Sequence, residues 1–241
     1  MNPTTALFKI GGKILGEFEN LKSTISQLKS LFEEKIFQKV IIIPGGGTFA
    51  NFIRKVYTEL KFTEEIAHFM GIISMNYNGL ELSRNFPDLE VIEDFSKLKE
   101  ISNAISIFLP YEYFKEHDNL PHSWDVTSDS IAIHLAKELE LSECYLIKDV
   151  DGILNDKNEV MKEISVSKFK DMNELGKLLK VKSNVEELKE RSSPIDAYAL
   201  TLIEQYKISC IILNGSKKKE RILKYFKSIS DEEKQYTKIK Y

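Results

Sequence analysis

The chain has 241 residues, of which 42% are hydrophobic, and this size and composition favour one large globular α/β domain with a substantial buried core. Its 34 basic and 37 acidic residues nearly cancel and are interleaved along the sequence, so we expect no basic surface for nucleic acid or an anionic membrane. No apolar run approaches the roughly 20 residues that span a bilayer, and the N-terminus shows no hydrophobic leader. We therefore expect a cytoplasmic protein that binds neither nucleic acid nor membranes.

Short β-branched runs alternate with longer segments of helical period, a pattern typical of a mainly parallel sheet covered by helices on both faces. In the first half, strands are predicted at residues 6–10, 39–43, 89–92 and 104–109. Apolar stripes predict helices with core-facing sides at residues 21–32, 49–60 and 66–73, and Thr63 is the expected N-cap of the last of these. Residues 111–123 collect Pro, His, Asn and Asp, which predicts a loop between two lobes.

The second half continues the alternation, with predicted helices at residues 129–139 and 193–206 and predicted strands at residues 144–147 and 209–213. Cys144 and Cys210 lie inside the two strands, where we expect buried thiols rather than a disulfide or a metal site. Residues 165–190 are charged and only weakly periodic. The predicted fold class is α/β, a three-layer αβα sandwich with a mainly parallel central sheet. We expect one domain over residues 1–241, with an acceptor-binding lobe at about 1–120 and a nucleotide-binding lobe at about 121–241.

Two glycine motifs follow predicted strands, at the edge of an open α/β sheet where ligands bind. Lys9-Ile10-Gly11-Gly12-Lys13 combines glycines, which let backbone N–H groups approach a phosphate, with two lysines that neutralise charge. In isolation, its glycine pair also fits a simple turn. Pro44-Gly45-Gly46-Gly47-Thr48 places three glycines at the start of a predicted helix, where backbone N–H groups bind anions. Because consecutive glycines cost chain entropy, we favour a functional role for them.

Two further motifs supply acids and hydroxyl groups. Trp124-Asp125-Val126-Thr127-Ser128-Asp129-Ser130 leads into an apolar helix, although Ser128 or Asp129 alone would also fit an N-cap. Lys148-Asp149-Val150-Asp151-Gly152 follows a predicted strand, where its acids would hold a ribose or order a metal-bound nucleotide and Gly152 would make the turn. Taken alone, this motif is also an ordinary Asx-type turn.

Together the four motifs predict phosphoryl transfer, a reaction that depends mainly on positioning and charge neutralisation. Glycine loops would hold both phosphates, a cation would lie between them, and a carboxylate would orient the cation. The sequence lacks the Gly-x-x-x-x-Gly-Lys-Ser/Thr loop and the protein-kinase signature set, which excludes the two commonest classes of nucleotide-using enzyme.

In this order the motifs resemble those of the amino acid kinase superfamily over essentially the whole chain. The resemblance implies a carbamate kinase-like fold, ATP and Mg²⁺ as cofactors, and a homo-oligomer that acts on a small molecule. It gives Lys9 the role of neutralising the transferring phosphate and Asp129 that of ordering the catalytic lysines. The motifs and the resemblance together assign as catalytic Lys9, Lys13 and Asp129; as nucleotide-binding Gly11, Gly12, Lys148, Asp149, Asp151 and Gly152; and as acceptor-binding Gly45, Gly46, Gly47, Asp125, Thr127 and Ser128.

Departures from the family pattern reduce the number of possible acceptor classes. Pro44 stands where isopentenyl phosphate kinases carry a histidine, which argues against that activity. Residues 193–197 resemble a segment of uridylate kinases and lack the second catalytic lysine of acetylglutamate kinases, which argues against a carboxylate acceptor. Lys13 is a candidate to replace part of that missing charge.

Residues 67–70, 121–130 and 148–152 are most similar to an archaeal branch that phosphorylates an aminomethyl-furanmethanol phosphate during methanofuran synthesis. That similarity implies an acceptor that is already a phosphomonoester, and therefore a diphosphate product. The alternatives are a uridylate or carboxylate kinase, and a non-catalytic nucleotide-binding sensor or storage protein on the same fold. The histidines show no metal-ligand spacing, but His68 and His122 lie in the branch-like blocks and are expected to line the acceptor site.

Overall fold

The computed structural model describes residues 4–179 and 194–241. Its strands form one eight-stranded sheet in the order β3-β4-β2-β1-β5-β7-β8-β6. The strands are β1 (Thr5–Ile10), β2 (Lys39–Pro44), β3 (Glu90–Ile92), β4 (Ala104–Phe108), β5 (Glu143–Lys148), β6 (Glu163–Ser165), β7 (Ser209–Asn214) and β8 (Thr237–Lys240). The helices are α1 (Gly12–Leu15), α2 (Phe18–Glu33), α3 (Gly47–Leu60), α4 (Glu64–Asn85), α5 (Phe95–Glu100), α6 (Tyr111–His117), α7 (Ser128–Glu138), α8 (Val166–Glu174), α9 (Ala197–Tyr206) and α10 (Arg221–Lys227), with a 3₁₀ turn η2 (Asp231–Glu233).

Strand β1 lies in the middle of the sheet and pairs in parallel with both β2 and β5. The register places Ile10 of β1 opposite Pro44 of β2 and Ile147 of β5. Because parallel strands end at the same edge, the motifs that follow β1, β2 and β5 converge there. Only β8 and β6, at one side of the sheet, run against the direction of the others.

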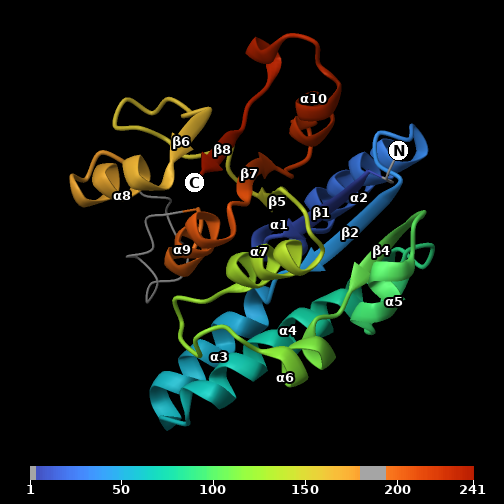
Figure 1. The fold of residues 1–241 in the computed structure, drawn as a ribbon, viewed down its shortest axis with the longest axis vertical. Helices are drawn as coiled ribbons and strands as arrows, with labels where there is room; N and C mark the ends of the chain where they lie inside the picture. The colour runs from blue at the N-terminus through green and yellow to red at the C-terminus, as the bar shows by residue number, and fades with distance from the viewer. Residues whose placement is uncertain (1–3, 180–193) are drawn as a thin grey trace.

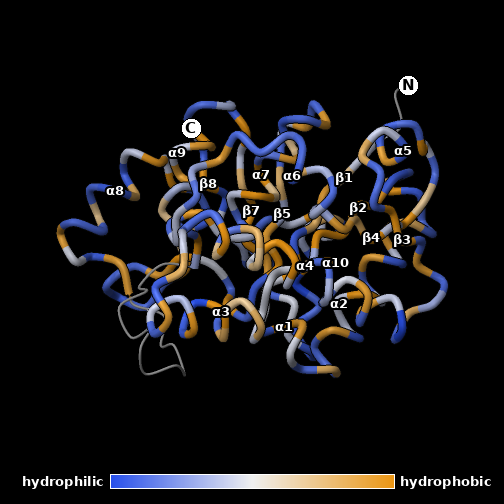
Figure 2. The backbone as a smooth tube through the Cα atoms, turned by 90° about the horizontal axis from the view of Figure 1, so that it is seen from below, coloured by the Kyte–Doolittle hydropathy of each residue, from blue (hydrophilic) through white to orange (hydrophobic). Residues whose placement is uncertain are grey.

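Alternate residues of the central strands face opposite sides of the sheet and build two separate cores. Leu7, Ile41 and Ile43 pack in a cluster with residues of α4, α7 and α9. Phe8 and Ile42 pack in the other cluster, with residues of α2 and α10. Figure 1 shows α7 and α9 side by side along the sheet, and Figure 2 shows hydrophobic segments concentrated along the central strands. The expected three-layer α/β fold with a mainly parallel sheet is confirmed.

Several local predictions are confirmed and others are wrong. Thr63 caps α4 by accepting a hydrogen bond from the N–H of Ile66, and Cys144 and Cys210 are buried free thiols. The predicted loop at residues 111–123 instead begins with α6, because Phe114 anchors that short helix in the core. The short strands β6 and β8 were not predicted, since three or four residues carry too little periodicity. The predicted helix start at Ser193 lies outside the described residues.

The apolar stripes of α3 and α4 were predicted to face the core, and much of that prediction is wrong. The most exposed members of the stripes leave at least 46% of their surface open to solvent, namely Phe49, Phe52, Leu60, Ile66 and Ile73. Their periodicity is that of an amphipathic helix, but the apolar side faces outward from this chain. None of the described helices combines the length and apolar character that a membrane-crossing segment needs.

Candidate active site

Two lysines share one buried carboxylate at the carboxyl edge of the sheet. The Nζ of Lys9, near the end of β1, lies 2.8 Å from Oδ1 of Asp129 in the first turn of α7. The Nζ of Lys148, the last residue of β5, lies 2.7 and 2.6 Å from the two carboxylate oxygens of Asp129. The side chains of Lys9 and Asp129 are each 4% exposed, and that of Lys148 is 15% exposed. Asp129 therefore holds two ammonium groups at one point.

Burial and charge set the ionisation of this group. Burial lowers the pKa of Lys9 from 10.5 to about 8; Lys148 adds to the lowering and Asp129 opposes it. Burial alone would raise the pKa of Asp129, but Lys148 and Lys9 outweigh it and hold that pKa well below its usual value. The carboxylate thus stays ionised at neutral pH, and Lys9 loses its proton in a mildly alkaline range.

The N-cap of α7 is Thr127, which accepts a hydrogen bond from the N–H of Asp129 at 3.4 Å. The alternative in which Ser128 or Asp129 serves merely as a cap is therefore wrong. Because the capping position falls on Thr127, the Asp129 carboxylate is left to bind the two lysines.

The two glycine motifs meet each other directly. Gly12 and Gly47 are the first residues of α1 and α3, whose opening N–H groups have no partner within their own helices. A Cβ on Gly12 would lie 2.5 Å from the Cα of Gly47, so only a glycine permits this approach. Gly47 also has a φ of +56°, a left-handed conformation that favours glycine. Two helix N-termini, each suited to an anion, consequently share one space.

Gly11 and Gly45 of these motifs have structural roles. The N–H of Gly11 donates to the carbonyl of Ile147, and the N–H of Gly45 donates to the carbonyl of Ile10, at 2.8 and 2.9 Å. These bonds extend the sheet pairing, so neither amide is available for a phosphate. A Cβ on Gly45 would also lie 3.3 Å from the side chain of Lys9, so this glycine makes room for the lysine.

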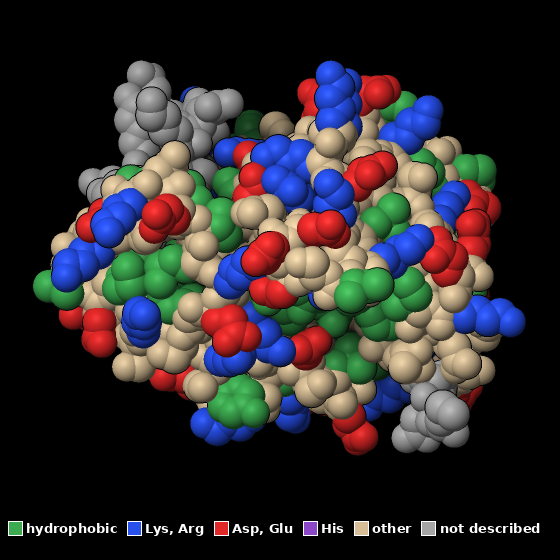
Figure 3. Space-filling model, turned by 90° about the horizontal axis from the view of Figure 1, so that it is seen from above, with side chains coloured by type: hydrophobic (Ala, Val, Ile, Leu, Met, Phe, Trp, Pro, Cys, Tyr) green, Lys and Arg blue, Asp and Glu red, His purple; other side chains and the backbone are tan. Residues whose placement is uncertain are grey.

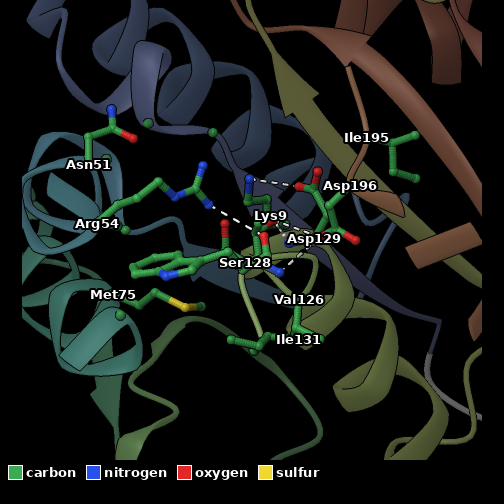
Figure 4. Close-up of a pocket in the computed structure, with 18 of the residues that line it drawn as sticks. Lys9, Asn51, Arg54, Met75, Val126, Ser128, Asp129, Ile131, Ile195 and Asp196 are labelled. Atoms are coloured by element: carbon green, nitrogen blue, oxygen red, sulfur yellow. Dashed lines mark hydrogen bonds and ion pairs between the residues drawn. The ribbon is translucent and has the colours of Figure 1, made fainter. Parts of the chain in front are cut away.

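A cavity of about 920 Å³ opens at this sheet edge and is lined by residues of all four motifs. Among the predicted acceptor-binding residues, its walls include Gly46, Gly47, Asp125, Thr127 and Ser128, whereas Gly45 lies outside the lining. Figure 4 shows Asn51 and Arg54 of α3 on one side of the cavity and Lys9, Asp129 and Asp196 on the other.

Three wall residues were not predicted as site residues. Arg54 stacks 4.5 Å from the ring centroid of Trp124 and donates to its carbonyl at 3.4 Å, and Asn51 lies three residues earlier on the same helix. A single cation or amide in an amphipathic helix carries no distinguishing sequence signal. Asp196 was part of a segment noted for its resemblance to uridylate kinases, and that resemblance was the available signal.

Asp196 ties the start of α7 to the start of α9. Its carboxylate accepts hydrogen bonds from the hydroxyl groups of Thr127 and Ser130, both at 2.6 Å, and from the N–H of Ala199 at 2.7 Å. The N–H groups of Thr127 and Ser130 add two more bonds at 3.1 Å. Burial, together with the nearby Asp129, raises the pKa of Asp196, while the hydroxyl donors oppose that rise. The Thr127 hydroxyl is thus already engaged within the protein.

The nucleotide motif divides into two parts. Lys148 and Asp149 line the cavity, and Asp149 pairs with the half-exposed Lys13 at 3.0 Å, so Lys13 does not contact Asp129. Asp151 lies outside the lining and binds Lys219 at 2.7 Å and Arg221 at 3.1 Å.

Gly152 also lies outside the cavity lining and has a structural place in the fold. Its φ of +148° and its closeness to Thr237 explain the glycine there, because a Cβ would lie 2.3 Å from the Thr237 hydroxyl. The turn predicted at Gly152 is therefore present.

The structure also brings together His68, Asp118 and His122, at one wall of the cavity. His68 lines the cavity as expected, whereas His122 stacks on His68 behind it, with ring centroids 4.7 Å apart. The histidines show no metal-ligand spacing in the sequence, and the grouping of His68 and His122 with Asp118 arises only in the fold, because the three residues come from α4 and a separate loop.

Charges on the surface are mixed in sign. Figure 3 shows acidic and basic side chains interspersed on the face seen from above, with apolar groups between them. This distribution agrees with the near cancellation of charge in the sequence.

Comparison with known proteins identifies the family of this chain. The amino acid kinase family matches residues 4–214. A [5-(aminomethyl)furan-3-yl]methyl phosphate kinase from Methanocaldococcus jannaschii is 30% identical over 211 residues, which cover 87% of each chain. The UMP kinase structure from Ureaplasma parvum has a TM-score of 0.68 at 19% identity and covers 99% of this chain and 100% of its own. The uridylate kinase structure from Archaeoglobus fulgidus has a TM-score of 0.65 at 20% identity, with 98% and 99% covered.

A mainly parallel sheet covered on both faces, with two helix N-termini beside a lysine pair, offers the positioning and charge neutralisation on which phosphoryl transfer depends. The chain belongs to the amino acid kinase family. Its activity is that of a small-molecule kinase.

Proposed function

We propose that this kinase transfers the γ-phosphate of Mg-ATP to a small phosphomonoester, giving a diphosphate and ADP. The observation that carries the proposal is the meeting of the α1 and α3 N-termini over Lys9, Asp129 and Lys148. Each helix start suits one phosphate, and the two lysines suit the group that passes between them. The relative from Methanocaldococcus jannaschii supports an acceptor of this class, since its name specifies a phosphate.

In the proposed reaction, an oxygen of the acceptor phosphate forms a bond to the γ-phosphorus as the bond to the β-bridging oxygen breaks. The electron pair of the broken bond leaves with ADP. Lys9 and Lys148 neutralise the negative charge that spreads over the transferring group, and Asp129 fixes both ammonium groups in place. A sensor or storage protein would not need such a buried charged trio, so its presence favours catalysis.

The nucleotide is assigned to the side formed by α1 and the loop after β5. Gly12, Lys148 and Asp149 line the cavity there, and the ion pairs of Asp151 with Lys219 and Arg221 hold the rest of that loop. Mg²⁺ would arrive on the phosphates of ATP and supply further charge neutralisation, with oxygen donors as its preferred ligands. We assign it no protein ligand.

The acceptor is assigned to the side formed by α3, with Gly46, Gly47, Ser128 and the cation of Arg54 around it. A guanidinium group and a helix N-terminus together favour an acceptor that already carries a phosphate. Arg54→Gln should raise the acceptor KM by roughly tenfold or more, because a charge-assisted bond contributes about 1.5–3 kcal/mol. The neighbouring exposed Lys55 offers a matched control, and Lys55→Gln should leave both KM values unchanged.

A carboxylate acceptor is the second candidate, and Lys148 is the observation that favours it. The sequence argued against such an acceptor because residues 193–197 lack the second catalytic lysine of acetylglutamate kinases, but Lys148, from another motif, brings a second cation to Asp129. This cation weakens that argument, so the proposed acceptor class rests on the α3 side of the cavity and on the similar phosphate kinase.

A paired assay separates the two candidates. Alcohols and their phosphate monoesters, including furanmethanol and uridine compounds, are offered with Mg-ATP beside glutamate and aspartate, and ADP formation is measured. We expect turnover of at least one monoester and of neither the matching alcohol nor the acids. Turnover of the acids alone would overturn the proposed acceptor while leaving the kinase assignment intact.

We also propose that the protein is a homo-oligomer in which a second copy covers the outward apolar side of α3 and α4. Phe49 of α3 and Tyr77 of α4 contact each other at 4.4 Å between ring centroids, and both are 46% exposed. A contiguous exposed apolar surface of this kind marks an interaction site. Ile73→Glu should give a monomer by light scattering, whereas Leu175→Glu, at another exposed apolar residue, should not; a monomeric wild type would refute this.

A further inference from the structure

His68, Asp118 and His122 form a compact group of potential metal ligands behind the acceptor side of the cavity. The Nε2 atoms of His68 and His122 lie 2.9 and 3.0 Å from the same oxygen, Oδ2 of Asp118. All three ligand atoms lie within 4.8 Å of one another, and the described residues contain no other such convergence of His, Cys, Asp or Glu. Two ligands in neighbouring positions of a metal bound at about 2.1 Å are separated by roughly 3.0–3.4 Å, so these spacings need little adjustment.

The hydrogen bonding within the group is incomplete. His122 makes a hydrogen bond to Asp118, but the Nε2 of His68 makes none of normal geometry, despite its short distance to the carboxylate. The side chain of His68 is only 3% exposed, so this ring nitrogen is buried beside the carboxylate without a hydrogen bond of normal geometry. A buried polar group without a well-formed hydrogen bond is costly, and a metal ion in the group would supply a well-directed partner.

The surroundings orient the three side chains in the manner of metal sites. The second carboxylate oxygen of Asp118 accepts a hydrogen bond from the N–H of Leu120 at 3.0 Å, which turns Oδ2 toward the histidines. The ring of Phe69 packs edge-on against both imidazoles, with centroids 5.6 Å from each. Outer hydrogen bonds and an apolar cover of this kind fix ligand geometry and restrict solvent.

We infer that His68, Asp118 and His122 bind a divalent transition-metal ion, with Zn²⁺ the best match. Imidazole nitrogens suit Zn²⁺, whereas Mg²⁺ prefers oxygen ligands, so this site is chemically distinct from the Mg²⁺ that accompanies ATP. Three protein ligands leave one position of a tetrahedral site for solvent. The ion would join α4 to the loop that continues into Trp124 and Asp125 of the cavity wall, and so would stabilise the acceptor side.

The test is metal binding by the full chain after removal of any purification tag and of bound metal with a chelator. Isothermal titration calorimetry with Zn²⁺ should show one equivalent of Zn²⁺ bound with micromolar affinity or tighter. Excess Mg²⁺ should not displace the bound Zn²⁺. Co²⁺ in place of Zn²⁺ should give visible absorption bands from nitrogen ligation. Zn²⁺ should also raise the melting temperature of the chain.

Variants of the two histidines test whether they bind the metal ion. His68→Ala and His122→Ala should each weaken Zn²⁺ binding at least about 100-fold and abolish the thermal shift. The exposed His117, next to Asp118 in sequence, is the matched control, and His117→Ala should bind as the wild type does. Circular dichroism checks folding. If the variant at the buried His68 does not fold, the variant at His122, whose side chain is 32% exposed, provides the test. No saturable site in the wild type, or unchanged binding in His122→Ala, would overturn the inference.

Discussion

Burial lowers the pKa of Lys9 to about 8. We therefore predict that, as the pH rises above this value, catalytic activity falls while the contribution of Lys9 to conformational stability increases. The reaction needs the charged form, so kcat/KM for ATP, which reports the free enzyme, should fall about tenfold per pH unit above that point. ATP adds negative charge next to the lysine and should shift the fall in kcat to higher pH.

Stability should respond with the opposite sign. Between about pH 8 and 10.5 the unfolded chain keeps the Lys9 proton that the folded chain has released, so the free energy of unfolding rises with pH. The shift corresponds to roughly 3 kcal/mol across that interval. Other titrating groups contribute too, so the quantity to measure is the difference between the wild type and Lys9→Met in urea denaturation at pH 7.5 and 10.5.

Lys9→Arg provides the second comparison, because an arginine keeps its charge throughout this range. Its remaining activity should show no fall near pH 8. A wild-type kcat/KM that stays flat to pH 10, or an unchanged alkaline fall in Lys9→Arg, would refute the assignment of the titrating cation to Lys9.

Four further predictions follow from the contacts around the site. Lys148→Ala should lower kcat on the order of 10²-fold with the fold retained by circular dichroism, and near wild-type turnover would contradict its proposed role. Gly12→Ala should raise the KM of both substrates and cost about 1–3 kcal/mol in chemical denaturation, because its Cβ would press on Gly47. Asp196→Asn should lower the free energy of unfolding by about 2–4 kcal/mol, since its amide nitrogen would face hydrogen-bond donors; a loss below measurement error would contradict the five-bond arrangement. Asp151→Asn should raise the ATP KM with little change for the acceptor, with Asp156→Asn, at an exposed position nearby, as the control.

The sheet and the principal motifs were predictable because their signals are local. The largely buried strands β1, β2 and β5 appear in the sequence as mainly apolar runs, and each is followed by a polar or glycine-rich motif. Parallel pairing then brings those motifs together without any further information. Lys9 was found in this way, whereas Asp129, in the motif before α7, was assigned its role by the family resemblance; the structure places the two side chains in contact.

The remaining features depend on contacts between distant segments. Lys148 was assigned to the nucleotide, and only the register of β5 beside β1 reveals that its ammonium group reaches Asp129. His68 and His122 converge through the packing of α4 against the loop after α6, which leaves no fixed spacing in the sequence. The outward apolar side of α3 could not be predicted for a related reason. Periodicity in the sequence identifies an apolar face of a helix but does not identify what covers that face.

The central position of β1 has a consequence for how such an enzyme can change its substrate. On one side of this strand, β2 leads into α3 and the assigned acceptor pocket; on the other, β5 leads into the assigned nucleotide loop. Lys9 belongs to the shared strand and pairs with Asp129 of α7, and Lys148 of β5 joins the same carboxylate. None of these three residues lies on α3 or α4, so we expect substitutions on those helices, away from the contact between Gly12 and Gly47, to alter the shape and charge offered to an acceptor with little effect on ATP binding. Such a division lets one scaffold acquire new acceptors through changes on a single side of the sheet.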